Sequence, residues 1–168
     1  GLSESIDAFK ALPATIRKQL VAAVNDVATA ARRDMVNRIS ADGFNTASVR
    51  ARIRLDKANA SNDVATISLD LKKIPFSRVK FASQRTDGTG TRASVWVLRG
   101  GKRVQVYGFI NPYGKKRRPM IRYAKAGKQR LVMAGGVGLR GWWNDIITEQ
   151  FLDELQANLA STFTRRVT

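Results

Sequence analysis

The N-terminal third of the chain carries apolar residues spaced three or four positions apart, which places them on one face of an α-helix. They are Ile16, Leu20, Val24, Val27, Ala31, Met35 and Ile39. Pro13 suits the first turn of a helix, where its missing N–H costs nothing, and Gly43 suits a left-handed stop. The spacing predicts a core-packing helix over residues 14–41, with an earlier short helical piece through Ile6 and Phe9.

Two later segments alternate apolar and polar residues, as a strand with one face on a core does. VRARIRL (49–55) places Val49, Ala51, Ile53 and Leu55 on one side and three arginines on the other. VATISLDL (64–71) repeats the alternation, and the turn-forming NASND lies between the two segments. The pattern predicts an antiparallel hairpin, whose arginine face either binds phosphates or is simply solvated.

A second hairpin is predicted over SVWVLRGGKRVQVYG (94–108), because Gly100-Gly101 can supply the positive φ angles of a two-residue turn. That turn sets Arg99 opposite Lys102, Val97 opposite Val104 and Val95 opposite Val106. The four valines then share one face, and the other face holds Trp96, Leu98, Arg103 and Gln105. Two further short strands are expected at 120–124 and 130–134.

Helical spacing returns near the C-terminus, where Trp143, Ile147, Phe151, Leu155 and Leu159 recur every four residues. This spacing predicts a helix over 143–163. The order of elements predicts an α+β fold with a long N-terminal helix, an antiparallel β-sheet of hairpins and a C-terminal helix packed on the sheet. Without an internal repeat or a Gly/Ser-rich linker, residues 1–168 are expected to form a single domain, with a basic β-rich middle segment, 49–134, between helices 14–41 and 143–163.

Charge is distributed unevenly along the chain. The chain has a formal net charge of +17, and residues 72–130 hold seventeen Lys or Arg against a single acid, Asp87. Such a concentration favours a polyanionic partner, either nucleic acid or an acidic protein surface. Its densest part, GKKRRPMIRYAKAGKQR (114–130), supplies the residues predicted to face DNA or an acidic partner: Lys115, Lys116, Arg117, Arg118, Arg122, Lys125, Lys128 and Arg130.

Several kinds of chemistry are excluded by composition. The chain has no histidine and no cysteine, so the usual general base near neutral pH, the commonest metal ligand and thiolate ligands are absent. We therefore predict no catalytic, metal-binding or cofactor-binding residues and no enzymatic activity. GVGLRG (136–141) matches a dinucleotide-binding fingerprint, but the helix that follows leaves no room for the rest of that fold. A flexible hinge or a packing turn is the preferred interpretation.

Trp142 and Trp143 are adjacent, and neighbouring residues on a helix cannot both face one core. The pair is therefore a candidate subunit interface, since aromatic residues are common anchors of such interfaces. Core burial of one residue with partial exposure of the other explains the pair equally well.

The order of short motifs over residues 15–125 resembles the phage minor tail protein Z, or tail-completion, family. Three short motifs follow the amphipathic helix and VRARIRL. The first is matched by Ile74, Pro75, Phe76, Ser77, Arg78 and Phe81. The second is a hairpin matched by Val95, Val97, Gly100, Gly101 and Lys102, and the third is matched by Gly108, Phe109 and Ile110. QRLVMAGGVGLRG (129–141) departs from the family pattern, which leaves the role of this segment open.

The resemblance implies a structural virion protein of the neck, at the head-proximal end of the tail, that helps to join tail to head and surrounds the DNA path. It also implies a homo-oligomeric ring, a hexamer, between a tail tube or tail terminator protein and a head connector protein. Contact with genomic double-stranded DNA is expected, and contact with a membrane is not. The protein would be made in the cytoplasm of a bacterial host.

A stand-alone nucleic-acid-binding protein without sequence specificity is the alternative prediction. The charge supports it, but only Tyr113 and Tyr123 lie within the densest basic stretch, so stacking platforms for bases are few.

Overall fold

The computed structural model of the chain describes residues 13–85, 93–110, 119–125 and 128–168. These residues form helices and antiparallel hairpins, so the predicted α+β class is confirmed. The chain divides into unit 1, made of Gly1–Met35, Ile53–Asp70 and Trp143–Thr168, and unit 2, made of Val36–Arg52 and Leu71–Trp142. The single domain expected from the sequence stays a prediction.

The long helix α2 spans Ala14–Ala41, as predicted. The carbonyl of Pro13 accepts a hydrogen bond from the backbone N–H of Arg17, so this proline stands at the start of the helix. The helix stops before Gly43, whose φ of +98° is a backbone conformation that residues with a side chain rarely adopt. One stripe of the helix is buried, at Ala23, Ala31, Met35, Val36 and Ile39.

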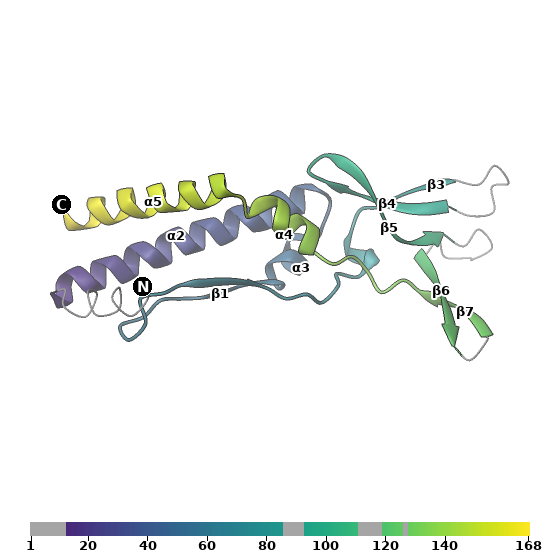
Figure 1. The fold of residues 1–168 in the computed structure, drawn as a ribbon, viewed down its shortest axis with the longest axis horizontal. Coiled ribbons are helices and arrows are strands. Elements are labelled where there is room, and N and C mark those ends of the chain that lie inside the picture. The colour runs from purple at the N-terminus through teal and green to yellow at the C-terminus, as the bar shows by residue number, and fades with distance from the viewer. Residues whose placement is uncertain (1–12, 86–92, 111–118, 126–127) are drawn as a thin grey trace. The chain divides into compact units, whose positions relative to one another are not determined.

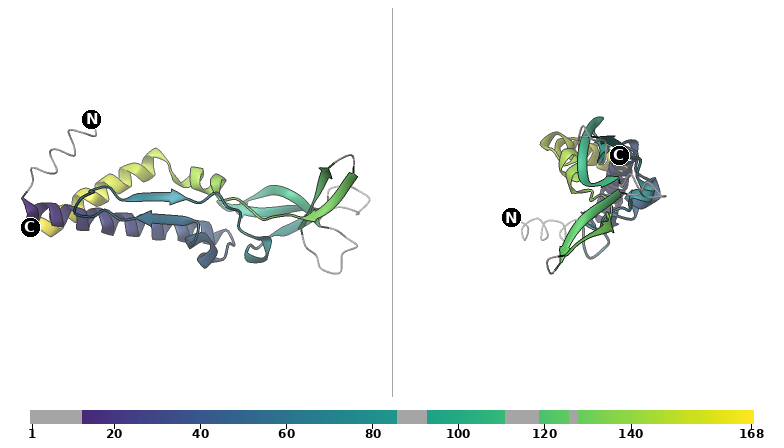
Figure 2. Two further views of the ribbon diagram at one scale, coloured as in Figure 1. Left: turned by 90° about the horizontal axis from the view of Figure 1, so that it is seen from below. Right: turned by 90° about the vertical axis from the view of Figure 1, so that its right-hand side faces the viewer.

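In unit 1, a two-stranded hairpin lies along α2 (Figures 1 and 2). Its strands, β1 (Ile53–Asp56) and β2 (Thr66–Leu69), pair antiparallel as predicted. Polar side chains of α2 hold the hairpin backbone. The amide of Asn25 both donates to the carbonyl and accepts from the N–H of Ala58, each at 2.9 Å, and Nε of Arg32 donates to the carbonyl of Ile53 at 2.7 Å.

The prediction of a strand over residues 49–55 is wrong for the first half of that segment. Thr46–Arg50 forms the short helix α3, and only Ile53 and the residues after it are extended. Asn45 caps α3, because its side-chain oxygen accepts a hydrogen bond from the N–H of Ser48 at 3.1 Å. The predicted arginine face is therefore divided, and Arg54 alone of its three arginines lies in β1, where it meets Asp70 at 3.6 Å.

The C-terminal helix is also interrupted, in contrast to the single helix predicted over 143–163. Helix α4 spans Arg140–Ile146 and helix α5 spans Glu149–Val167. Thr148 separates them, because its hydroxyl accepts a hydrogen bond from the N–H of Phe151 at 3.2 Å and so caps α5. In unit 1, Arg166 of α5 forms an ion pair with Asp26 of α2. None of the described helices is both long and apolar enough to cross a membrane.

Unit 2 contains a five-stranded antiparallel sheet whose strands are neighbours in the order in which they occur in the chain (Figure 1). The strands are β3 (Ala82–Arg85), β4 (Ala93–Arg99), β5 (Lys102–Ile110), β6 (Pro119–Lys125) and β7 (Lys128–Met133). Strands β3 and β7 therefore form the two edges of the sheet. Strand β6 covers the segment predicted at 120–124, and β7 covers residues 130–133 of the segment predicted at 130–134.

The β4–β5 hairpin has the predicted register, with Arg99, Val97 and Val95 opposite Lys102, Val104 and Val106. Gly100 and Gly101 have φ angles of +56° and +77°, as a two-residue turn of this kind requires. Val95 and Val97 are buried, whereas Leu98, Arg103 and Gln105 of the other face are exposed. The register shifts beside Ser94, where Gly108 of β5 has a φ of +149° and the strand bulges.

Asp42 connects three parts of unit 2. Its carboxylate accepts hydrogen bonds from the indole N–H of Trp142 at 2.9 Å and from the backbone N–H of Gly100 at 2.8 Å. The ring of Trp142 meets Phe44 edge to face, with 5.0 Å between the ring centroids. A carboxylate that follows α2 thereby holds the tip of the β4–β5 hairpin and the start of α4.

The chain enters and leaves the sheet at one point. Ile74 and Val137 form an isolated antiparallel bridge in which each N–H donates to the carbonyl of the other residue at 2.8 Å. Ile74 precedes the short 3-10 helix η1 (Phe76–Arg78), and Val137 follows β7. Gly136 makes the bridge possible, because a Cβ atom there would lie 2.1 Å from the carbonyl oxygen of Ile74.

Gly136→Ala is expected to destabilise the protein by more than about 2 kcal/mol, because it adds a clash with the main chain to a strained φ of +125°. Gly138→Ala is the matched control, since a Cβ there meets nothing within 4 Å. The control should stay within about 0.5 kcal/mol of the parent in urea unfolding. Equal stability of the two variants would contradict this account of the bridge.

Asp42→Ala is expected to cost about 1–3 kcal/mol, because it leaves the N–H of Trp142 and that of Gly100 without their acceptor. Asp63→Ala removes the same charge from a loop residue and serves as the control. The free energy of unfolding in urea is measured for both variants. Both variants raise the net positive charge by the same amount, so the difference between them reports the loss of these hydrogen bonds. A loss in Asp63→Ala as large as that in Asp42→Ala would show that charge alone is responsible.

Candidate functional site

The predicted basic residues belong to unit 2, but the structure describes only some of them. Lys115, Lys116, Arg117 and Arg118 lie outside the described residues. Lys125 and Lys128 are backbone partners at the end of the β6–β7 hairpin. Arg122 and Arg130 are exposed, and they lie on opposite faces of the hairpin, because Arg122 pairs with Leu131, the residue next to Arg130. The described cations therefore do not form a single flat patch.

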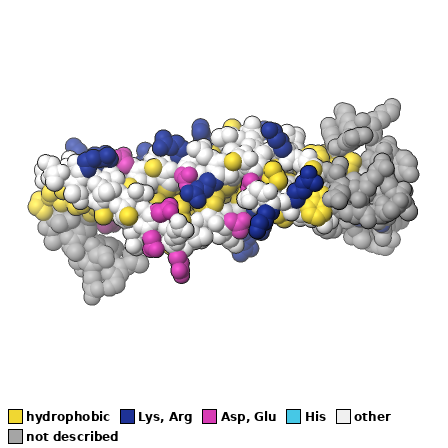
Figure 3. Space-filling view, turned by 90° about the horizontal axis from the view of Figure 1, so that it is seen from above, with side chains coloured by type: hydrophobic (Ala, Val, Ile, Leu, Met, Phe, Trp, Pro, Cys, Tyr) yellow, Lys and Arg dark blue, Asp and Glu magenta, His cyan; other side chains and the backbone are white. Residues whose placement is uncertain are grey.

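The two units differ strongly in charge. Unit 2 contains twenty-one Lys or Arg and two acids, whereas unit 1 contains nine Lys or Arg and eleven acids. Figure 3 shows one face of the described surface, on which acidic side chains lie among basic ones over part of the chain and hydrophobic side chains are exposed between them. The excess of positive charge from which a polyanionic partner was predicted therefore lies in unit 2, the unit that holds the five-stranded sheet.

Strand β7 exposes three consecutive apolar residues, which the sequence analysis did not single out. Leu131, Val132 and Met133 are 49%, 37% and 60% exposed. A strand with one face on a core alternates apolar and polar residues, so an unbroken apolar run in a strand implies that both of its faces are covered. The absence of alternation in QRLVMA was the signal available in the sequence.

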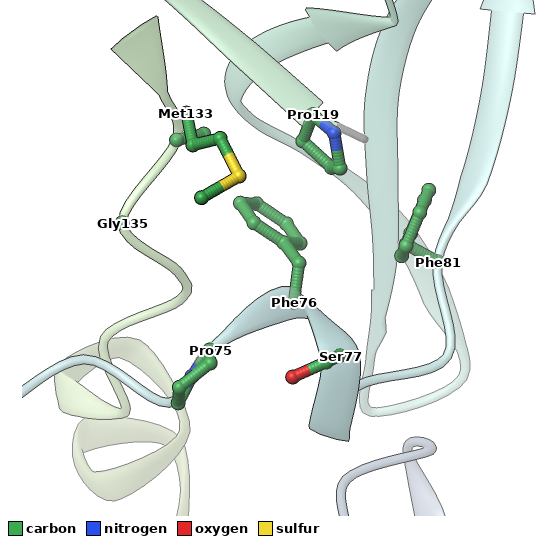
Figure 4. A pocket seen from close by; sticks show the side chains of 8 residues that line it. Pro75, Phe76, Ser77, Phe81, Pro119, Met133 and Gly135 are labelled. Carbon is green, nitrogen blue, oxygen red and sulfur yellow. The ribbon is translucent and has the colours of Figure 1, made fainter. Parts of the chain in front are cut away.

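An apolar pocket of about 580 Å³ lies beside the end of β7 (Figure 4). In Figure 4 the side chains of Met133 and Phe76 point toward one another, and Pro119 lies above the ring of Phe76. Phe76 and Phe81 also meet edge to face, with 5.7 Å between their centroids. The pocket is lined by Pro75, Phe76, Ser77, Phe81, Pro119, Met133, Ala134 and Gly135.

The two tryptophans have different environments. Trp142 is 6% exposed. Its indole N–H donates to Asp42 and its ring contacts Phe44, and both of these residues belong to unit 2. Trp143, a residue of unit 1, is half-buried. The burial of Trp142 agrees with the alternative in which one residue belongs to a core and the other is partly exposed. A role for this pair in a subunit interface stays a prediction.

The glycine-rich loop GVGLRG (136–141) packs within unit 2. Gly136 touches the backbone of Ile74, and Val137 and Leu139 are buried. These contacts are those of a packing turn, which was one of the two interpretations preferred from the sequence. Within the described ranges no three acidic side chains are grouped so that they could hold a metal ion.

Comparison with known proteins adds one match. The family model for prophage minor tail protein Z (GPZ) matches residues 1–165. No curated protein and no solved structure matches the chain. Because the family model spans nearly the whole sequence, this chain belongs to the prophage minor tail protein Z family and is a structural component of a phage tail.

Proposed function

We propose that this tail protein acts at the head-proximal end of the tail, where it completes the tail, helps to join it to the head and surrounds the DNA path. The observation that carries this proposal is the concentration of positive charge in unit 2, which has twenty-one Lys or Arg and two acids. Within a tail, a surface of this charge fits the place where the genome or an acidic neighbouring protein passes close to the subunit.

The chemistry of the surface fits a conduit better than a reader of sequence. Lys and Arg side chains contact phosphates through charge, and such contacts depend on salt but carry no information about bases. Arg122 and Arg130, two exposed cations of the β6–β7 hairpin, lie on opposite faces and so do not form a single base-reading surface. Weak, sequence-independent contact would let DNA pass without holding it.

The proposal includes a homo-oligomeric ring, hexameric as in the family resemblance, with a tail tube or tail terminator protein on one side and a head connector protein on the other. It assigns no catalytic role to the protein. The alternative of a stand-alone nucleic-acid-binding protein predicts tight binding to DNA fragments and no association with tails. Electron microscopy of the purified protein and of particles distinguishes the two.

Neutralising Lys115, Lys116, Arg117 and Arg118 to Gln is expected to leave folding intact and to impair the joining of heads to tails. The matched control neutralises Lys18, Arg33, Lys57 and Arg165, which are exposed residues of unit 1, and removes the same charge. The measurements are the circular dichroism of each variant and the fraction of particles with joined tails. Normal joining in the first variant would make its charge a solubility feature.

If the partner is DNA, the variant with Lys115, Lys116, Arg117 and Arg118 changed to Gln should bind double-stranded DNA fragments with a weaker dependence on salt. The slope of log K against log salt should become shallower by about 3 to 4 for four lost phosphate contacts. The unit 1 control should keep the slope of the parent protein. An unchanged slope with impaired joining would assign these four residues to an acidic protein neighbour.

A further inference from the structure

Strand β7 is an edge of the five-stranded sheet, and no described strand pairs with its outer side. The direction of its backbone groups follows from one observed contact. The N–H of Ala134 donates to the carbonyl of Pro119, the first residue of β6, which lies opposite it. Because inward and outward groups alternate along an antiparallel strand, Val132 also faces β6, and the N–H and carbonyl groups of Leu131 and Met133 face away from the sheet.

The second half of this edge, after Arg130, lacks the devices that usually prevent a strand from pairing with another chain. Edge strands are commonly protected by charged side chains, proline or a bulge. The second half of β7 instead presents Leu131, Val132 and Met133, all exposed, and β6–β7 pairing is regular from Met120↔Met133 to Lys125↔Lys128. Met133 also lines the apolar pocket, so the outward-facing backbone of Leu131 and a hollow for an apolar side chain lie close together along the strand.

The charge around this edge indicates the nature of its partner. Arg130 precedes the apolar run and is exposed, and Arg122 lies across from Leu131. Lys73 lies near Gly135, a residue that lines the pocket. Its Cδ atom is 4.0 Å from the position that a Cβ atom at Gly135 would occupy. No ion pair with a described acid is seen for these three cations, and unit 2 contains only two acids. An extended segment with acidic and apolar side chains would complement them.

We propose that β7 is a docking edge that accepts an added strand from an acidic segment of another virion protein, with an apolar side chain of that segment in the pocket. The proposal rests on the proposed function, since it identifies one contact of the completed tail. DNA offers neither a strand edge nor an aliphatic side chain for the pocket. Unit 2 of a second copy would bring the same excess of positive charge to this edge.

A single thiol can test the contact, because the chain has no cysteine of its own. Leu131→Cys, carrying a photoactivated cross-linker, is assembled into particles, and Leu152→Cys on α5, another exposed apolar position, is the matched control. The expected result is a cross-link from position 131 to an acidic segment of a different virion protein. Cross-linking only to a second copy, only to DNA, or no more than at position 152 would overturn the proposal.

A second variant tests the backbone contact. Leu131→Pro removes an N–H that faces away from β6, and proline is tolerated at such edge positions. Leu131→Val keeps the N–H and an apolar side chain. With the fold of both variants verified by circular dichroism, the proline variant is expected to bind the cross-linked partner about three- to tenfold more weakly, as the loss of one main-chain hydrogen bond implies. Equal binding by the two variants would exclude strand addition.

The failure of this proposal can be distinguished from the failure of the proposed function. Particles assembled without the protein test the function, because heads and tails that still join would show that it is not a completion protein. A cross-link from position 131 to a second copy in particles that need the protein for joining would reject the docking edge and leave the proposed function standing.

Discussion

The backbone contact between Ile74 and Gly136–Val137 is the constraint on which unit 2 depends. All five strands of its sheet lie between these two points of the chain, and two backbone hydrogen bonds of 2.8 Å close the segment at its base. A glycine is required there because the carbonyl of Ile74 occupies the space of a Cβ atom. The residues just inside the bridge, Pro75, Phe76 and Met133 to Gly135, make up much of the lining of the pocket.

Local patterns in the sequence predicted most of the elements. The β4–β5 hairpin followed from Gly100-Gly101 and from the alternation of valines, because turn and alternation specify the same register. The failures came from caps. Asn45 caps a helix that ends within the predicted strand, at Arg50, and Thr148 caps α5 and so divides a continuous apolar spacing into α4 and α5. A cap outweighs periodicity over such short segments because it satisfies backbone groups directly.

The candidate site was predictable only in part. The positions of Lys and Arg in the sequence located the positive charge in the middle of the chain, and unit 2 contains that segment. The pocket and the open edge bring together residues far apart in sequence, which no local pattern specifies. Phe76 and Met133 line the same pocket, and Ile74 and Val137 form a bridge. Trp142 illustrates the same limit, because its partner, Asp42, is separated from it by one hundred positions.

The bridge at Ile74 and Val137 has a consequence for how such a protein can change over evolutionary time. A segment whose two ends meet is attached to the rest of its unit like an insert, so its strands and connections can lengthen, shorten or be exchanged while the attachment point stays fixed. Tail proteins must match neighbours that differ from phage to phage. A sheet whose segment is closed by the Ile74–Val137 bridge can diversify its contact surface while the buried residues of the bridge keep their packing.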